Sequence, residues 1–310
     1  MKKDDYIKIA YYYYTLGLTQ DEIAKRMSLT RQRVNYIIKS LVELDIVSIN
    51  IHGYEQESAK LECDLEERYQ LNKVIVADDY GEDETSVFKV ANVAAQYLDD
   101  TIVQGDIIGV SWGRTLEHIV KQMQYRKKET CRVVQLMGAY NVEKEGEKSD
   151  ELVRSLANHL ECPSHIFYAP LIVEHEETKQ WLLKEKGILS SYELMEKCNL
   201  AIIGVGEISE ESTMYRRGYY SKQDIDCLKE EGFIADIVMN PIRKDGTWDE
   251  CPMSSRIMSA GIDCLRKIDN TVLIAAGEKK CEVIKAALHT GCINTLILDK
   301  KTAIRILESE

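Results

Sequence analysis

The chain has 310 residues and a formal net charge of -12, with 45% hydrophobic and 30% charged residues. This length is enough for about two domains, and the composition excludes both a disulfide-stapled mini-protein and a mainly disordered chain. No apolar run approaches the roughly 20 residues that a membrane helix needs, and no signal-peptide core follows the first residues. We therefore expect a cytoplasmic protein with no membrane partner.

Nine cysteines are scattered through the sequence without a C-x-x-C pair or a Cys/His spacing suited to zinc. Unpaired cysteine behaves as a small hydrophobic residue and is often buried. The sequence therefore predicts reduced, mostly buried thiols, with no disulfide framework, no metal site and no catalytic cysteine.

The charge is distributed unevenly along the chain. The first 50 residues carry 8 Lys+Arg against 6 Asp+Glu, a balance of +2, whereas the rest carries 32 against 46, a balance of -14. A polyanion such as DNA is therefore expected to bind the N-terminal segment and to be repelled by the remainder.

Three helices are predicted in this N-terminal segment. The first spans residues 4–16 and ends at a glycine, and the second runs from about residue 20 to 26. Thr19 and Glu22 form a capping-box pattern at the start of the second helix. The apolar positions at helical spacing in the first helix are Ile7, Ala10, Tyr11 and Tyr14.

The third helix follows a short turn and has two different faces. Its apolar stripe consists of Val34, Ile37, Ile38 and Leu41. Its other face carries groups that can bond base edges and phosphates, as a recognition helix requires. The predicted DNA-binding residues are Gln20, Thr30, Arg31, Gln32, Arg33, Asn35, Tyr36 and Lys39. The second and third helices, joined by a short turn, are interpreted as a helix-turn-helix, to which a short strand over residues 46–51 would add a wing. The alternative for the whole segment is a small helical bundle that dimerises and leaves its polar face solvated.

A polar hinge over residues 53–58 separates the two predicted domains, 1–55 for DNA binding and 56–310 for effector binding and oligomerisation. Beyond the hinge, continuously apolar runs alternate with amphipathic helical stretches. The predicted strands are 73–77, 107–111, 132–136, 166–170, 200–205, 272–276 and 294–298. This alternation is typical of a parallel sheet covered on both faces, an α/β domain of Rossmann type.

Loops at the carboxyl ends of such strands are where ligands bind. The candidate effector-binding residues in or near these loops are Ser111, Gly113, Arg114, Thr115, Gln135, Gly138, Gly206, Glu207, Asp236 and Lys280. A phosphate would suit the segment 111–115, where glycine and a helix start follow a strand; the alternative is an ordinary tight turn. The G-x-G at 204–206 lacks the third glycine of the dinucleotide fingerprint, so no NAD or other cofactor is predicted.

Asp236 lies within an apolar run, so its carboxylate must be paired or hydrogen-bonded. It either holds a backbone turn or bonds sugar hydroxyls. Lys279, next to Lys280, is interpreted as a solvated side chain.

The segment LTQDEIAKRMSLTRQRVNYIIKSL at 18–41 resembles the DNA-binding region of the SorC family of bacterial sugar-responsive transcriptional regulators. Motifs similar to the family's effector domain follow in the same order: GVSWGRTL at 109–116, QLMGA at 135–139, AP at 169–170, AIIGVG at 201–206, ADI at 235–237, AAGxxK at 275–280 and NTLILD at 294–299. The sequence departs from the pattern at Ala276, where the family often has Gly, and at Leu298, where it often has Thr.

The resemblance implies a fold related to sugar-phosphate isomerases, with the phosphate held at 111–115. It implies that Asp236 and Lys280 face the sugar, with Gln135 and the 204–207 loop nearby. It also implies a homotetramer that presents paired heads to operator DNA.

The predicted function is a DNA-binding transcriptional regulator controlled by a phosphorylated sugar or a related metabolite. The rival prediction is a sugar-phosphate isomerase-like enzyme with a helical appendage, because fold does not fix function. No convincing catalytic set supports it: six histidines are dispersed and none lies in a glycine loop, although Glu207 and Asp236 could form an acid/base pair. A sensor that does not bind DNA is opposed by the basic third helix.

Overall fold

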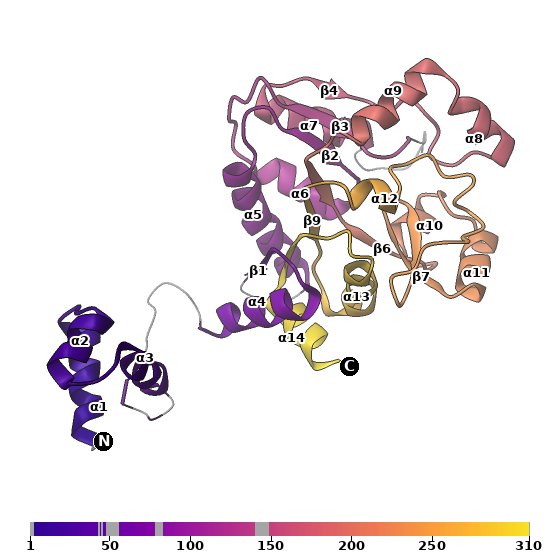
Figure 1. Ribbon diagram of the computed structural model, residues 1–310. Helices are drawn as coiled ribbons and strands as arrows, with labels where there is room; N and C mark the ends of the chain where they lie inside the picture. The colour runs from indigo at the N-terminus through magenta and orange to yellow at the C-terminus, as the bar shows by residue number, and fades with distance from the viewer. Residues whose placement is uncertain are drawn as a thin grey trace. The chain divides into compact units, whose positions relative to one another are not determined.

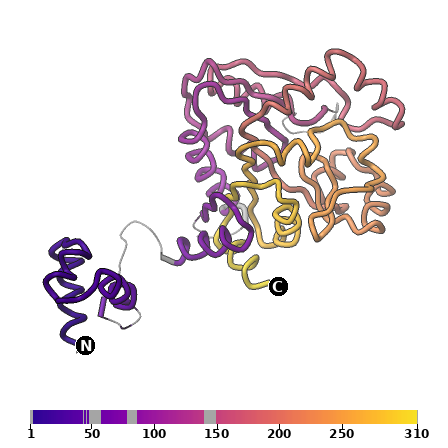
Figure 2. Tube along the Cα trace, in the orientation of Figure 1, coloured from indigo at the N-terminus to yellow at the C-terminus, as the bar shows by residue number. Residues whose placement is uncertain are grey.

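The computed structural model describes residues 3–42, 44, 46–47, 56–77, 83–139 and 149–309, without the side chains of residues 56 and 83–85. The chain divides into two compact units, residues 1–56 and residues 57–310. Figure 2 traces the chain through both. The predicted strand at 46–51 and hinge at 53–58 fall mainly outside the described residues.

The N-terminal unit consists of short helices around a small core. α1 (Lys3–Ala10) continues into a π-helical turn, η1 (Tyr11–Thr15), which is followed by α2 (Gln20–Met27) and α3 (Arg31–Ser40). The core residues are Ile9, Ala10, Ile23, Ala24, Val34, Ile37, Ile38 and Leu41. The predicted helices and the apolar stripe of the third are confirmed.

The predicted apolar face of the first helix is largely wrong. Tyr11 is 52% exposed and Ile7 is 47% exposed, whereas Ile9 is fully buried. A run of four tyrosines places apolar groups on every side of a helix, so spacing alone does not select the face that packs.

The predicted caps are present. The Thr19 hydroxyl accepts from the Glu22 N–H, and the Glu22 carboxylate accepts from the Thr19 N–H at 2.8 Å. The Thr30 hydroxyl accepts from the Arg33 N–H at 3.2 Å and fixes the start of α3. These side chains replace the hydrogen bonds that the first turn of a helix lacks.

The second unit is built on a parallel sheet. Within the described residues its seven strands lie in the order β1-β10-β9-β5-β2-β3-β4. Their bounds are β1 Lys73–Ala77, β2 Ile107–Val110, β3 Arg132–Gln135, β4 Ser164–His165, β5 Leu200–Ile203, β9 Asn270–Ile274 and β10 Thr295–Asp299. The predicted parallel α/β domain is confirmed, but the strand predicted at 166–170 is wrong, because pairing with β3 ends at His165 and the chain then leaves the sheet.

Helices cover both faces of this sheet (Figure 1). The helices of the chain from α4 onward, whether or not they lie on this sheet, are α4 Gln56–Tyr69, α5 Asp83–Thr101, α6 Arg114–Gln122, α7 Ser149–Leu160, α8 Glu176–Leu182, α9 Lys186–Met195, α10 Thr213–Arg216, α11 Lys222–Glu230, α12 Ile262–Leu265, η2 Glu278–Lys280, α13 Cys281–His289 and α14 Lys300–Glu308. The crossovers through α5, α6 and α7 step toward β4, and the crossover through α13 steps the opposite way. Right-handed crossovers in opposite directions place their helices on opposite faces.

A second, antiparallel sheet was not predicted. β6 (Val205–Glu207) follows β5 directly and pairs with β7 (Phe233–Ile237), which pairs with β8 (Asn240–Arg243). These strands are short, and their apolar run was interpreted only as the surroundings of a carboxylate. None of the helices in the described parts of the chain is both long and apolar enough to cross a membrane.

Close packing at Gly138 predicts a loss of stability for Gly138→Ala. A Cβ there would lie 2.6 Å from the Pro170 carbonyl oxygen and 2.7 Å from that of Ala169. Backbone atoms cannot yield cheaply, so the free energy of unfolding should fall by about 1–3 kcal/mol or more. The control is Gly187→Ala in α9, where nothing lies within 4 Å of the added methyl. Urea unfolding of both variants checks this, and equal stability of the two would contradict it.

Candidate functional site

The topology of the parallel sheet brings several predicted loops to one place. From β2 the chain proceeds toward β3 and β4, whereas from β5 it proceeds toward β9 and β10, and β2 and β5 are neighbours. Ligands in open α/β sheets bind at such a reversal, beyond the carboxyl ends of the strands. The loops that meet there include those after β2 and β5, and β9 lies beside β5.

The loop after β2 offers hydrogen-bond donors to an anion. Gly113 precedes α6 with φ 157° and ψ 155°, a backbone region that is essentially restricted to glycine, and no side chain caps the helix. The uncapped first turn therefore keeps free N–H groups and the positive end of the helix dipole. The buried hydroxyl of Ser111 has no hydrogen-bond partner among the described residues. Together these groups form a corner whose hydrogen-bond donors and positive helix end suit an anion.

Two predicted cations interact electrostatically at this corner. Arg114 is exposed at the start of α6, and Lys280 is half-buried at the end of η2, where its Nζ lies 3.4 Å from the Val205 carbonyl oxygen. Burial and the positive charge of Arg114 lower the pKa of Lys280, while Asp236 and Glu207 oppose that effect. The structure thus brings together four residues that are far apart in the sequence. A bound anion would relieve the repulsion between the two cations.

Asp236 is buried on β7 opposite Gly206 of β6. Its Oδ2 accepts from the Met239 N–H at 3.3 Å, and its Oδ1 has no partner among the described residues. Burial raises the pKa of Asp236 to about 6, against the lowering effects of the Met239 N–H and of Lys280. Of the two roles that the sequence left open, the structure therefore shows that Asp236 holds a turn, and its second oxygen stays available to a ligand.

The absence of a side chain at Gly206 leaves the space that the Asp236 carboxylate occupies. A Cβ at position 206 would lie 2.3 Å from Oδ1 of Asp236. The second glycine of the G-x-G pattern therefore serves the approach of a neighbouring strand's carboxylate. Glu207, the next residue, is exposed at the end of β6.

The turn after α10 covers the loop after β2, which the sequence did not indicate. The guanidinium of Arg217 lies 4.3 Å from the centre of the Trp112 ring, and the rings of Trp112 and Tyr219 are 5.9 Å apart. The Tyr220 hydroxyl is buried with no partner in the described structure, and its pKa is raised by burial and by Asp236. Only tertiary packing brings this segment to the site.

Gln135 and Gly138 have structural roles. Gln135 is fully buried, its amide nitrogen donates to the Ser149 hydroxyl at 2.9 Å, and its amide oxygen accepts from the Phe167 N–H at 3.2 Å. It ties β3 to α7 and to the segment after β4. Gly138 allows the close approach of the 169–170 backbone.

The N-terminal unit presents the predicted polar face of α3. All the predicted residues of this helix are exposed, namely Arg31, Gln32, Arg33, Asn35, Tyr36 and Lys39. Gln20 of α2 donates to the Asn35 side-chain oxygen at 3.3 Å, and Arg31 lies 3.8 Å from the Asp21 carboxylate. The Arg33 guanidinium lies 5.4 Å from the centre of the Tyr36 ring. Arg, Asn and aromatic groups therefore share one solvent-facing surface.

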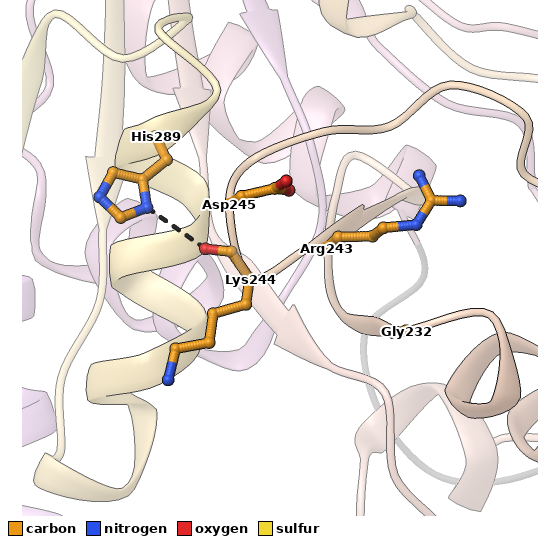
Figure 3. A pocket seen from close by; sticks show the side chains of 5 residues that line it. All are labelled: Gly232, Arg243, Lys244, Asp245 and His289. Atoms are coloured by element: carbon orange, nitrogen blue, oxygen red, sulfur yellow. Dashed lines mark hydrogen bonds between the residues drawn. The ribbon is translucent and has the colours of Figure 1, made fainter.

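A surface pocket of about 740 Å³ lies elsewhere, between the β8 turn and the end of α13 (Figure 3). Its lining residues are Gly232, Arg243, Lys244, Asp245 and His289. Lys244 pairs with Glu282 at 2.7 Å, Arg243 donates to the Glu231 carbonyl, and His289 Nδ1 lies 3.2 Å from the Lys244 carbonyl oxygen. These polar groups of the pocket already have partners within the protein, whereas the Ser111 hydroxyl has none among the described residues. The corner at Ser111 is therefore the better candidate for a ligand site.

No group of three or more metal-ligating side chains occurs among the described residues. All nine cysteines are free thiols, and Cys63 and Cys227 are exposed.

The raised pKa of Asp236 predicts a pH-dependent stability. The folded state holds the proton of this carboxyl more tightly than the unfolded state does. Its contribution to the free energy of unfolding is therefore fully present below about pH 4 and is lost as the pH rises through 6. Relative to Asp236→Asn, the free energy of unfolding of the wild type should fall by about 2 kcal/mol between pH 4 and 7. Urea titrations of both proteins over this range measure the difference, which should stay constant if the carboxyl titrates normally.

Known proteins are similar to this chain over nearly its whole length. The sequence model of the family described as "Putative sugar-binding domain" matches residues 55–308. The deoxyribonucleoside regulator of Bacillus subtilis (strain 168) is 26% identical over 298 residues, covering 96% of this chain and 95% of that protein. The erythritol catabolism regulatory protein EryD of Brucella abortus (strain 2308) is 24% identical over 299 residues, covering 96% and 94%.

A solved structure extends the likeness to the fold. The full-length sorbitol operon regulator SorC from Klebsiella pneumoniae superimposes with a TM-score of 0.78 at 25% identity, covering 99% of this chain and 100% of that one. The relatives are named as regulators, and the family is not one of enzymes. The chain therefore belongs to the SorC family of sugar-responsive transcriptional regulators, and residues 55–308 match that family's sugar-binding domain.

Proposed function

We propose that the corner at Ser111–Thr115, with Lys280, binds the phosphate of a phosphorylated sugar, and that this ligand controls operator binding. The observation that carries this is the meeting of two cations, Arg114 and Lys280, at an uncapped helix N-terminus beside an unpartnered hydroxyl. Each of these features favours a dianion over a neutral ligand.

The sugar itself would lie against Asp236. The free Oδ1 of this carboxylate is an acceptor for a ligand hydroxyl, and a carboxyl whose pKa is about 6 is largely ionised at neutral pH. Glu207 and Thr115 would add polar contacts at the rim, while Gln135, Gly138 and Gly206 shape the loops. The relatives named for deoxyribonucleosides, erythritol and sorbitol suggest a small polyhydroxylated metabolite.

Residues 1–55 would form a winged helix-turn-helix DNA-binding domain, and residues 56–310 the effector-binding and oligomerisation domain. The exposed polar surface of α3, with Gln20 and Thr30 at the helix starts, would enter the major groove. A homotetramer acting in the cytoplasm would present paired heads to a two-fold symmetric operator, since half-site spacing mirrors protein symmetry. A domain related to sugar-phosphate isomerases would then serve as a sensor.

Lys280→Ala and Ser111→Ala should abolish stabilisation by phosphorylated sugars. A ligand at about 100 times its dissociation constant stabilises the wild type by about 2.7 kcal/mol, which raises Tm by roughly 5–10 °C. Thermal unfolding with matched pairs, such as glucose and glucose 6-phosphate or ribose and ribose 5-phosphate, measures this shift.

The matched control is Lys279→Ala, because Lys279 is the exposed neighbour of Lys280. It should retain the full shift. A shift that is equal for free and phosphorylated sugars, or that survives in Lys280→Ala, would refute the phosphate assignment.

Arg31→Ala and Arg33→Ala should each weaken operator binding by about tenfold, or about 1.4 kcal/mol. If the replaced arginine contacts a phosphate, its removal should also reduce the slope of binding affinity against salt concentration by about one counterion. Fluorescence anisotropy with an operator selected from random duplexes measures both effects. Lys8→Ala, an exposed position on α1, is the control and should bind as the wild type does; unchanged affinity in both arginine variants would exclude α3 as the recognition helix.

A further inference from the structure

One buried carboxylate links the proposed effector loop to the last helix. Asp299, at the end of β10, is 2% exposed. Its Oδ2 accepts from the Gly277 N–H at 2.7 Å and from the Thr302 hydroxyl at 2.7 Å, and its Oδ1 accepts from the Thr302 N–H at 3.0 Å. The first turn of α14 and the loop that leads to Lys280 are therefore held by the same side chain.

Both ends of α14 contact α4. Near the start of α14, Lys300 Nζ lies 2.7 Å from a Glu57 carboxylate oxygen. At its end, the Leu307 carbonyl accepts from the Arg68 guanidinium at 2.9 Å. Figure 1 shows the two helices beside each other. A displacement of α14 therefore changes contacts at both ends of α4.

α4 is itself hydrogen-bonded to β1, the strand at the edge of the sheet. The carboxylates of Glu66 and Glu62 accept from the N–H groups of Val74 and Val76, each at 2.8 Å. These bonds occupy donors that an edge strand otherwise leaves open. Because the two acceptors are one helical turn apart and the two donors are alternate residues, a shift of α4 along β1 must exchange both bonds together.

We propose that Asp299 is a positioning residue that transmits the state of the effector loop through α14 to α4. This inference rests on the proposed anion site. The loop, α14 and α4 form a continuous series of bonded contacts, and α4 is the first helix of the second unit, from which the chain leads directly back to the N-terminal unit. A ligand that selects one arrangement of the loop around Gly277 thereby selects one arrangement of α14 and α4.

The weakness of the contacts between the helices suits this role. The Lys300–Glu57 pair lies on the surface, with the Glu57 side chain 70% exposed, so it contributes little to global stability. Breaking it should leave the fold intact and weaken the transmission, because it removes the contact near the start of α14 and leaves the Arg68–Leu307 contact at its end. A regulatory coupling requires only a small difference between two states, reciprocal between the two sites.

Hydrogen–deuterium exchange of the full-length protein, with inorganic phosphate as the probe, tests this path. At about ten times its dissociation constant, phosphate should slow exchange of residues 277–283 by about tenfold. In the wild type it should also slow α4, residues 57–69, by about fivefold, the lower end of typical couplings between sites.

Two variants should separate these responses. Asp299→Asn keeps one oxygen to cap α14, for which Asn and Asp are equivalent, but offers fewer acceptors to share with the Gly277 N–H. Glu57→Gln breaks the ion pair with Lys300. Each variant, at about ten times its own dissociation constant for phosphate, should keep the slowing at 277–283 and show a clearly smaller slowing in α4 than the wild type.

The control is Glu210→Gln, which breaks another exposed pair, with Lys222 at 3.4 Å; it should behave as the wild type. Slowing at 277–283 with no response of α4 in the wild type would overturn the path and leave the anion site standing. A full α4 response in both variants would also overturn it. No slowing at 277–283 would refute the anion site, and the path with it.

Discussion

Parallel pairing of the strands is the constraint on which the rest of the second unit depends. It places the carboxyl ends of β2, β5, β9 and β10 on one edge, and right-handed crossovers in two opposite directions leave the reversal between β2 and β5. Residues separated by more than a hundred positions, such as Arg114 and Lys280, meet there because of strand order alone. The chemistry of the site is a consequence of that order.

At this edge, two ionisable side chains are withdrawn from water without full compensation. Lys280 carries its charge in a half-buried position beside another cation, and Asp236 holds a buried carboxylate with one oxygen unpaired. Each is costly in the absence of a ligand, because burial disfavours charge and an unpaired buried acceptor loses its hydration. A ligand with a negative group at one end and hydroxyls at the other would satisfy both.

Control of DNA binding by such a ligand needs a physical connection and a difference in affinity between two states. The charge balance of -14 over the residues after position 50 disfavours contact between the second unit and DNA, and the DNA-binding surface that we propose is that of α3 in the N-terminal unit. The connection between the ligand site and the N-terminal unit must then pass through the elements near the start of the second unit. Asp299, α14 and α4 meet that requirement with a few contacts that can change without unfolding the core.

The sequence by itself determined most of the helices, most strands of the parallel sheet and the candidate site residues. Capping patterns such as Thr19 with Glu22 and the apolar runs of the parallel strands are local signals, so they identified the helices and the α/β class. The same patterns singled out Ser111, Arg114, Asp236 and Lys280. Tertiary structure alone decided which face of the first helix is buried, that Gln135 is enclosed by the protein, and that β6, β7 and β8 form a second sheet. It alone brought Trp112 under Arg217 and joined Gly277 to Asp299. These features depend on contacts between distant segments, and the periodicity of a single segment carries no information about its partner.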